Sequence, residues 1–149
     1  MQAIKSRLAG SRLVGRLFAT LLFGAFIYLG ANGISDAAAI LINPSASTVL
    51  LPISAESARA RAIVLMAINL VIALSGAAVV LGAWQRTRLL YGWVVVALMY
   101  AVLGGYQIAG ALLEFHRPEF AVAGMAYLLL AAAAWSFGQR FTRSPAGRG

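Results

Sequence analysis

Four long stretches of almost purely apolar residues dominate the chain, and short polar segments separate them. A helix needs about 20 residues to cross the hydrocarbon core of a bilayer. The strict alternation that is typical of strands does not occur in these stretches, and helices satisfy their own backbone amides in lipid. The pattern therefore predicts an all-α integral membrane four-helix bundle, formed as a single domain by residues 1–149, with spans at approximately 17–42, 63–83, 91–113 and 120–137.

Composition strengthens this assignment to a membrane protein. Hydrophobic residues make up 62% of the chain and charged residues 11%, well below the roughly 25% charged residues of a soluble domain. Since cysteine is absent, disulfides and thiolate metal sites are excluded. The net charge of +8 does not indicate nucleic-acid binding, because the chain has no basic face interleaved with aromatic residues.

The basic residues are distributed unequally between the two sides of a four-span chain. The first side holds nine of them, namely Lys5, Arg7, Arg12, Arg16, Arg86, Arg88, Arg140, Arg143 and Arg148. The other side holds three basic residues and all four acids, namely Arg59, Arg61, Arg117, Asp36, Glu56, Glu114 and Glu119. Because cytoplasmic segments carry the excess of Lys and Arg, we predict that both termini are cytoplasmic in a bacterial inner (plasma) membrane.

Arg86 and Arg88 lie in the short segment between the second and third stretches, where Trp84, Tyr91 and Trp93 flank them. We interpret the two arginines as residues that fix the topology of a tight cytoplasmic turn, and the aromatic residues as an interfacial belt. The alternative is that this turn docks a partner.

Two features of the first half leave alternatives open. A basic segment, an apolar run and the small residues Ala31-Asn32-Gly33 also match a secretory signal that is cleaved. We favour an intact first span, because the apolar run resumes after Asp36. In the long connection 43–62, either Ser54 or Ser57 is expected to cap the second helix.

Few residues suggest chemistry. His116 lies between Glu114 and Glu119, but one histidine between two acids is weak evidence for a metal site, and we expect the segment from His116 to Glu119 to be a solvated turn. Asn32, Asn69 and Gln107 are amides inside three different spans and are expected to bridge helices. Together with Tyr106 they form a speculative quinone-facing set. We therefore predict no catalytic residues and no metal.

Two segments carry a resemblance to a known family. The stretches GRLFATLLFGAFIYLG (15–30) and SGAAVVLGAWQRTRL (75–89) resemble the DoxX-like family of small four-helix membrane proteins. Gly15-Arg16 opens the first helix, and a Gly-rich second helix runs through Gly82 into Thr87-Arg88. The resemblance implies association with redox or quinone-linked membrane complexes.

We expect from these observations a small accessory or assembly subunit of a larger membrane complex, with no catalytic activity of its own. Its expected partners are membrane lipids and other membrane protein subunits. A quinone-linked oxidoreductase subunit of DoxX-like type is the alternative, and a small transporter is the second alternative. No intrinsic cofactor is expected, and quinone or lipid is the bound molecule that the sequence indicates.

Overall fold

Four long helices form the protein in a computed structural model that describes residues 2–44, 54–85 and 87–143. They are α1 (Gln2–Ile42), α3 (Ala55–Gln85), α4 (Gly92–Gly110) and α5 (Pro118–Arg143). A 3-10 turn, η1 (Arg88–Tyr91), precedes α4, and a π-helical turn, η2 (Ala111–Phe115), follows it. The described residues contain no strand, and four helical segments are long and apolar enough to cross a membrane. The predicted all-α four-helix membrane fold is therefore confirmed.

Three of the helices, α1, α3 and α5, are longer than the apolar stretches that predicted them, whereas α4 is shorter and continues as the turns η1 and η2 at its two ends. The second helix begins at Ala55 instead of Ile63, because Ser54 caps it: the backbone N–H of Ser57 donates to Ser54 Oγ at 3.2 Å. The last helix begins at Pro118, a residue suited to the first helical position because its missing N–H has no intrahelical acceptor there. Residues outside the apolar stretches thus extend α3 and α5 at their N-terminal ends.

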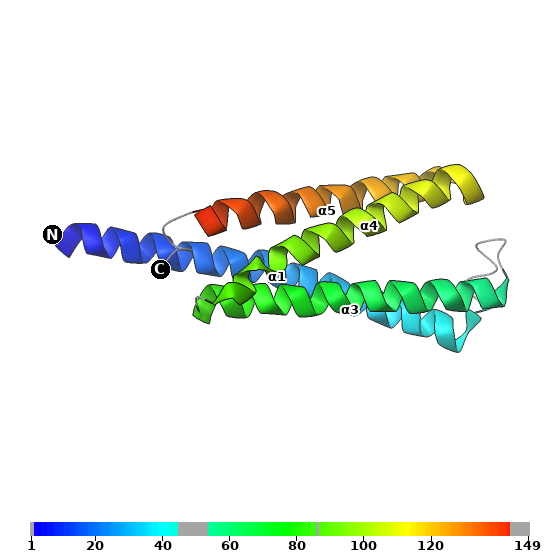
Figure 1. The fold of residues 1–149 in the computed structure, drawn as a ribbon, viewed down its shortest axis with the longest axis horizontal. Helices are drawn as coiled ribbons and strands as arrows, with labels where there is room; N and C mark the ends of the chain where they lie inside the picture. Colours follow the sequence, from blue (N-terminus) through cyan, green and yellow to red (C-terminus); the bar gives the residue numbers. More distant parts are fainter. Residues whose placement is uncertain (1, 45–53, 86, 144–149) are drawn as a thin grey trace.

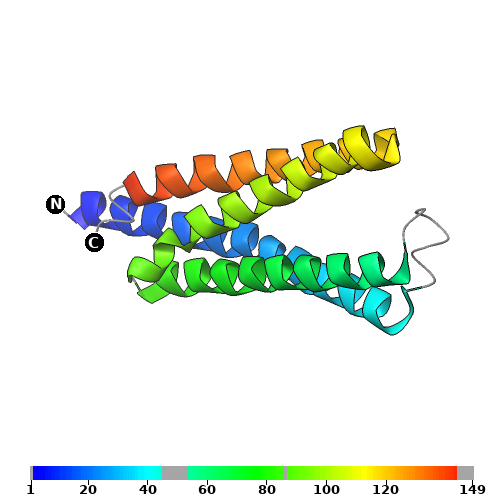
Figure 2. The ribbon, with the colours of Figure 1, turned by 45° about the vertical axis from the view of Figure 1, so that its right-hand side comes forward.

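The helices are arranged as two antiparallel pairs. α1 lies along α3, and α4 lies along α5 (Figure 1). The two pairs meet chiefly through α3, η1 and α4 and diverge toward the end where α5 begins (Figure 2). Aromatic contacts connect the pairs: the Phe26 and Tyr100 ring centres are 5.2 Å apart, and the Phe23 and Phe137 ring centres are 6.2 Å apart.

The tight turn between the pairs depends on a glycine. A Cβ at Gly82 would collide with the backbone of Leu90. Two backbone hydrogen bonds hold the turn. The Leu90 N–H donates to the Thr87 carbonyl at 3.2 Å within the turn, and the Thr87 N–H donates to the Gly82 carbonyl of α3 at 3.3 Å. Close approach of the turn to α3 therefore brings α4 back beside α3.

Both described chain ends lie at the same end of the bundle (Figure 1). There a Cβ at Gly15 would lie 3.1 Å from the Phe141 ring, so the last turns of α5 pack on α1. The 41 residues of α1 correspond to about 60 Å of helix, roughly twice the hydrocarbon thickness. The N-terminal part of α1 therefore extends beyond the membrane-spanning part of the bundle.

Candidate functional site

A groove of about 280 Å³ lies between α3 and α4. Residues three and four positions apart share one face of a helix, and the lining follows this spacing on both helices. α3 and α4 line the groove with Ala60, Arg61, Val64, Leu65, Ile68, Val102 and Tyr106. The walls are thus apolar except for one guanidinium and one phenol.

The groove arises because α3 and α4 diverge. Near η1 the helices are in close contact, since a Cβ at Gly92 would lie 2.9 Å from the Ser75 carbonyl oxygen. Further along, the two helix pairs diverge (Figure 2), and the groove lies in this part, where Ala60 contributes only a small side chain to its lining. The site is therefore a consequence of the angle between the helix pairs.

Arg61 lies near the N-terminal end of α3. Trp84, whose side chain is 45% exposed, is on the same helix near its opposite end. The rise of 1.5 Å per residue places Arg61 and Trp84 about 35 Å apart, slightly more than the thickness of the hydrocarbon core. The groove therefore runs from Arg61, near one end of a helix long enough to cross a bilayer, toward Ile68.

The four residues of the predicted quinone-facing set lie in different surroundings. Asn32 is exposed on α1, and Gln107 is half-buried on α4 outside the groove lining. Asn69 donates its amide to the Leu65 carbonyl at 2.8 Å and packs against Gly33. Only Tyr106 lines the groove. Arg61 is a lining residue that was not among the predicted site residues, although its spacing of four and seven residues from Leu65 and Ile68 is a signal in the sequence for a shared helix face.

A second groove, of about 290 Å³, lies between α4 and α5. Small side chains dominate its lining, which comprises Ala97, Leu98, Ala101, Ala131, Ala132, Trp135 and Ser136. Trp135 of this lining packs edge-on against Trp93, with ring centres 5.1 Å apart. This surface allows another helix to approach the backbone closely.

The predicted aromatic belt beside the turn is partly wrong. Trp84 and Tyr91 are 45% and 57% exposed, as a belt requires, but Trp93 is only 6% exposed. Trp93 is buried because Gly138 leaves space for its indole: a Cβ at Gly138 would collide with the ring. Trp93 therefore contributes to packing between α4 and α5.

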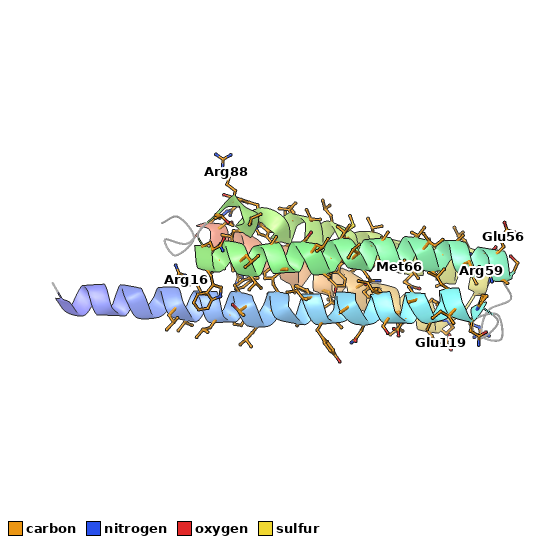
Figure 3. The ribbon with its side chains drawn as sticks, turned by 90° about the horizontal axis from the view of Figure 1, so that it is seen from below. Arg16, Glu56, Arg59, Met66, Arg88 and Glu119 are labelled. Atoms are coloured by element: carbon orange, nitrogen blue, oxygen red, sulfur yellow. The ribbon has the colours of Figure 1, made fainter. Side chains whose placement is uncertain are left out.

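The turn itself carries Arg88, which is exposed and extends away from the helices (Figure 3). Arg86 lies outside the described residues. At the same end Arg16 lies over the Trp84 ring, 5.9 Å from its centre. Glu56, Arg59 and Glu119 lie at the opposite end (Figure 3), so the charge segregation seen in the sequence corresponds to two ends of the bundle.

The end with the acids also contains the turn before α5. His116 has a left-handed backbone (φ 50°, ψ 35°) and is exposed, as are Arg117 and Glu119. The exposure agrees with the predicted solvated turn, although helix α5 already begins at Pro118. In residues 2–44, 54–85 and 87–143, no group of three or more His, Cys, Asp or Glu side chains could hold a metal ion.

Comparisons with protein-family models, with curated proteins and with solved structures find no match to this chain. The resemblance to the DoxX-like family therefore stays a prediction from Gly15-Arg16 and from the segment 75–89. In the structure Arg16 and Arg88 lie at the same end of the bundle (Figure 3).

Proposed function

We propose that the protein is a small accessory or assembly subunit of a larger complex in the bacterial inner membrane. The groove between α4 and α5 is the observation that carries this proposal. Helices associate in lipid through van der Waals packing at small residues, because lipid tails supply no hydrophobic driving force between helices. Ala101, Ala132 and Ser136 provide such a surface, and a transmembrane helix of a partner subunit is its occupant.

The orientation belongs to the same proposal. Both described chain ends lie at one end of the bundle, and the order of the spans in the sequence assigns nine of the 12 basic residues to the side of the membrane that holds the chain ends. The excess of Lys and Arg favours the cytoplasm for this end. The partner helix accordingly meets α4 and α5 within the bilayer, with the turn at Arg88 on its cytoplasmic side.

Two neighbouring alanines provide a matched test. Ala132 lines the groove and Ala133 does not, and both are exposed on α5. Ala132→Leu should fill the groove and release the partner, whereas Ala133→Leu should retain it. The measurement is native purification followed by mass spectrometry of the intact complex. A wild-type chain that purifies in mild detergent without a stoichiometric partner would contradict the accessory role.

The quinone-linked alternative has less support from the arrangement of the residues. Of the four predicted quinone-facing residues only Tyr106 lines a groove, and the Asn69 amide bonds to its own helix. The alternative therefore remains a prediction, and extraction of quinone from the purified protein tests it directly.

A further inference from the structure

We propose that a polar face of α1 binds a transmembrane helix of another protein, and that this helix carries a cationic residue and an amide one turn apart. The polar face consists of Tyr28, Asn32, Ser35 and Asp36. It lies on the first helix pair and is separate from the groove between α4 and α5, on which the accessory role depends.

The polar face points away from α3. Its four residues are separated by four, three and one positions and therefore share one side of the helix, and all of them are exposed. The opposite side contacts α3, since a Cβ at Gly30 would lie 2.9 Å from the Asn69 carbonyl oxygen and a Cβ at Gly33 would collide with the Asn69 side chain. Packing against α3 thus leaves the polar face uncovered.

The other helix pair contacts a different part of α1. The ring contacts of α1 with α4 and α5 come from Phe18, Phe23 and Phe26, which all precede the polar face, and the helix pairs diverge beyond them (Figure 2). Within the described part of the chain, no hydrogen bond or ion pair joins Asn32 or Asp36 to another residue. The polar face is therefore open to a molecule outside the chain.

The exposed amide of Asn32 lies within the membrane-spanning part of α1. The apolar segment of this helix is Leu13–Ile42, which is 30 residues long, and about 20 residues cross the hydrocarbon core. Every window of that length within the segment contains both Tyr28 and Asn32. Because hydrocarbon offers no hydrogen bonds, an exposed amide at this position favours association with a molecule that supplies them.

The length of the polar face favours a helix over a lipid as this molecule. From Tyr28 to Asp36 the face extends over eight residues, or about 12 Å along the helix axis. A lipid has polar atoms only in its head-group region, so its acyl chain cannot satisfy an amide one turn further along. A partner helix presents side chains at the same spacing of one turn, and polar side chains form hydrogen bonds between helices in membranes.

The carboxylate of Asp36 determines the charge of the partner. An ionisable residue in a membrane span pairs with a group of opposite charge, so a Lys or Arg side chain on the partner helix complements Asp36. A second copy of this chain is a poor occupant, because a symmetric contact through the same face would place two Asp36 carboxylates opposite each other. The face therefore fits a different protein.

Three synthetic transmembrane peptides serve as probes of this face. All are leucine-rich helices of equal length. The first carries Asn and, four residues later, Lys; in the second Glu replaces Lys; in the third both positions are Leu. Each is added to the full-length protein in dodecyl maltoside micelles, and association is measured by fluorescence energy transfer. We expect the peptide with Asn and Lys to bind about tenfold more tightly than either of the others.

Reversal of one charge tests the pairing with Asp36. Asp36→Lys should transfer the preference to the peptide with Asn and Glu. Glu56→Lys changes the net charge equally at an exposed position on α3 (Figure 3), and it should leave the original preference unchanged.

A second pair of variants tests the amide without changing charge. Asn32→Leu should weaken binding of both peptides that carry Asn, whereas Ala31→Leu, at the neighbouring exposed position outside the polar face, should not. Helix content and thermal unfolding establish that each variant is folded.

Several results would overturn the proposal. Equal binding of the three peptides would do so, as would equal effects of Asp36→Lys and Glu56→Lys. Energy transfer between copies of the protein alone that Asn32→Leu removes would assign the face to a second copy. Labelling of Asn32→Cys by an impermeant maleimide in sealed cells would assign it to a water-filled cavity. None of these results affects the Ala132→Leu test, so failure of this site and failure of the accessory role are distinguishable.

Discussion

Trp84 donates its indole N–H to the hydroxyl oxygen of Thr20 at 2.9 Å and thereby joins α3 to α1. The Thr20 hydroxyl in turn donates to the Arg16 carbonyl at 2.9 Å, and the Arg16 guanidinium lies over the same indole. One side chain of α3 therefore contacts two successive turns of α1. This arrangement sets the register of the first helix pair at the end where the chain termini lie.

The bond between Trp84 and Thr20 should be measurable as a coupling energy. Trp84→Phe removes the donor, Thr20→Val removes the acceptor, and the double variant closes a thermodynamic cycle. We expect a coupling of about 0.5–1 kcal/mol, since hydrogen bonds between membrane helices average about 0.6 kcal/mol. Reversible unfolding in mixed micelles provides the free energies, and strictly additive single effects would show that the bond contributes nothing.

Contact between Gly33 and the Asn69 side chain should make Gly33 intolerant of a larger residue. A Cβ at Gly33 would collide with the Asn69 amide group, so Gly33→Ala should destabilise the protein by about 1–3 kcal/mol through overpacking. Gly24→Ala is the matched control on α1, because a Cβ there has no neighbour within 4 Å. Adding Asn69→Ala to Gly33→Ala should restore part of the loss. Equal effects of the two glycine substitutions would contradict this packing.

The hydroxyl of Tyr100 should be dispensable for folding. Tyr100 is 2% exposed, and its hydroxyl has no hydrogen-bond partner in the described part of the chain. A buried polar group without a partner costs about 1–3 kcal/mol, so Tyr100→Phe should leave stability unchanged or raise it by up to that amount. Thermal unfolding in detergent measures the change. A clear loss of stability would mean that the hydroxyl has a partner in the membrane.

The orientation can be tested because the chain contains no cysteine. Thr87 and Arg117 are exposed at opposite ends of the bundle, so Thr87→Cys and Arg117→Cys report on the two sides of the membrane. In sealed cells a membrane-impermeant maleimide should label Arg117→Cys directly and Thr87→Cys only after permeabilisation. Equal labelling of both variants would contradict the four-span arrangement.

Neutralising the turn separates the two interpretations of its arginines. Replacing Arg86 and Arg88 by asparagine should preserve the labelling pattern of Thr87→Cys, because the other seven basic residues on this side still favour the same orientation. Loss of a partner with unchanged labelling would instead identify the turn as a docking site. Native mass spectrometry of the double variant makes this measurement.

The sequence by itself determined the four helices, the sharing of one end by both termini, and the segregation of charge between the two ends. These properties depend on local composition, since the thickness of the bilayer sets a helix length that an apolar stretch reveals directly. The N-cap was also local, because Ser54 acts within its own turn.

Only the tertiary structure decided which side chains meet. The position of Trp93 beside the turn predicts an interfacial residue. Its indole is buried instead, because Gly138, 45 residues later in the chain, has no side chain and leaves space for the ring. The sequence also allowed Asn69 to face a ligand. In the structure its amide donates to the Leu65 carbonyl on the same helix and packs against Gly33. Arg61 and Tyr106 share a groove because the helix pairs diverge, and that angle depends on packing among residues from all four helices, which no local pattern records.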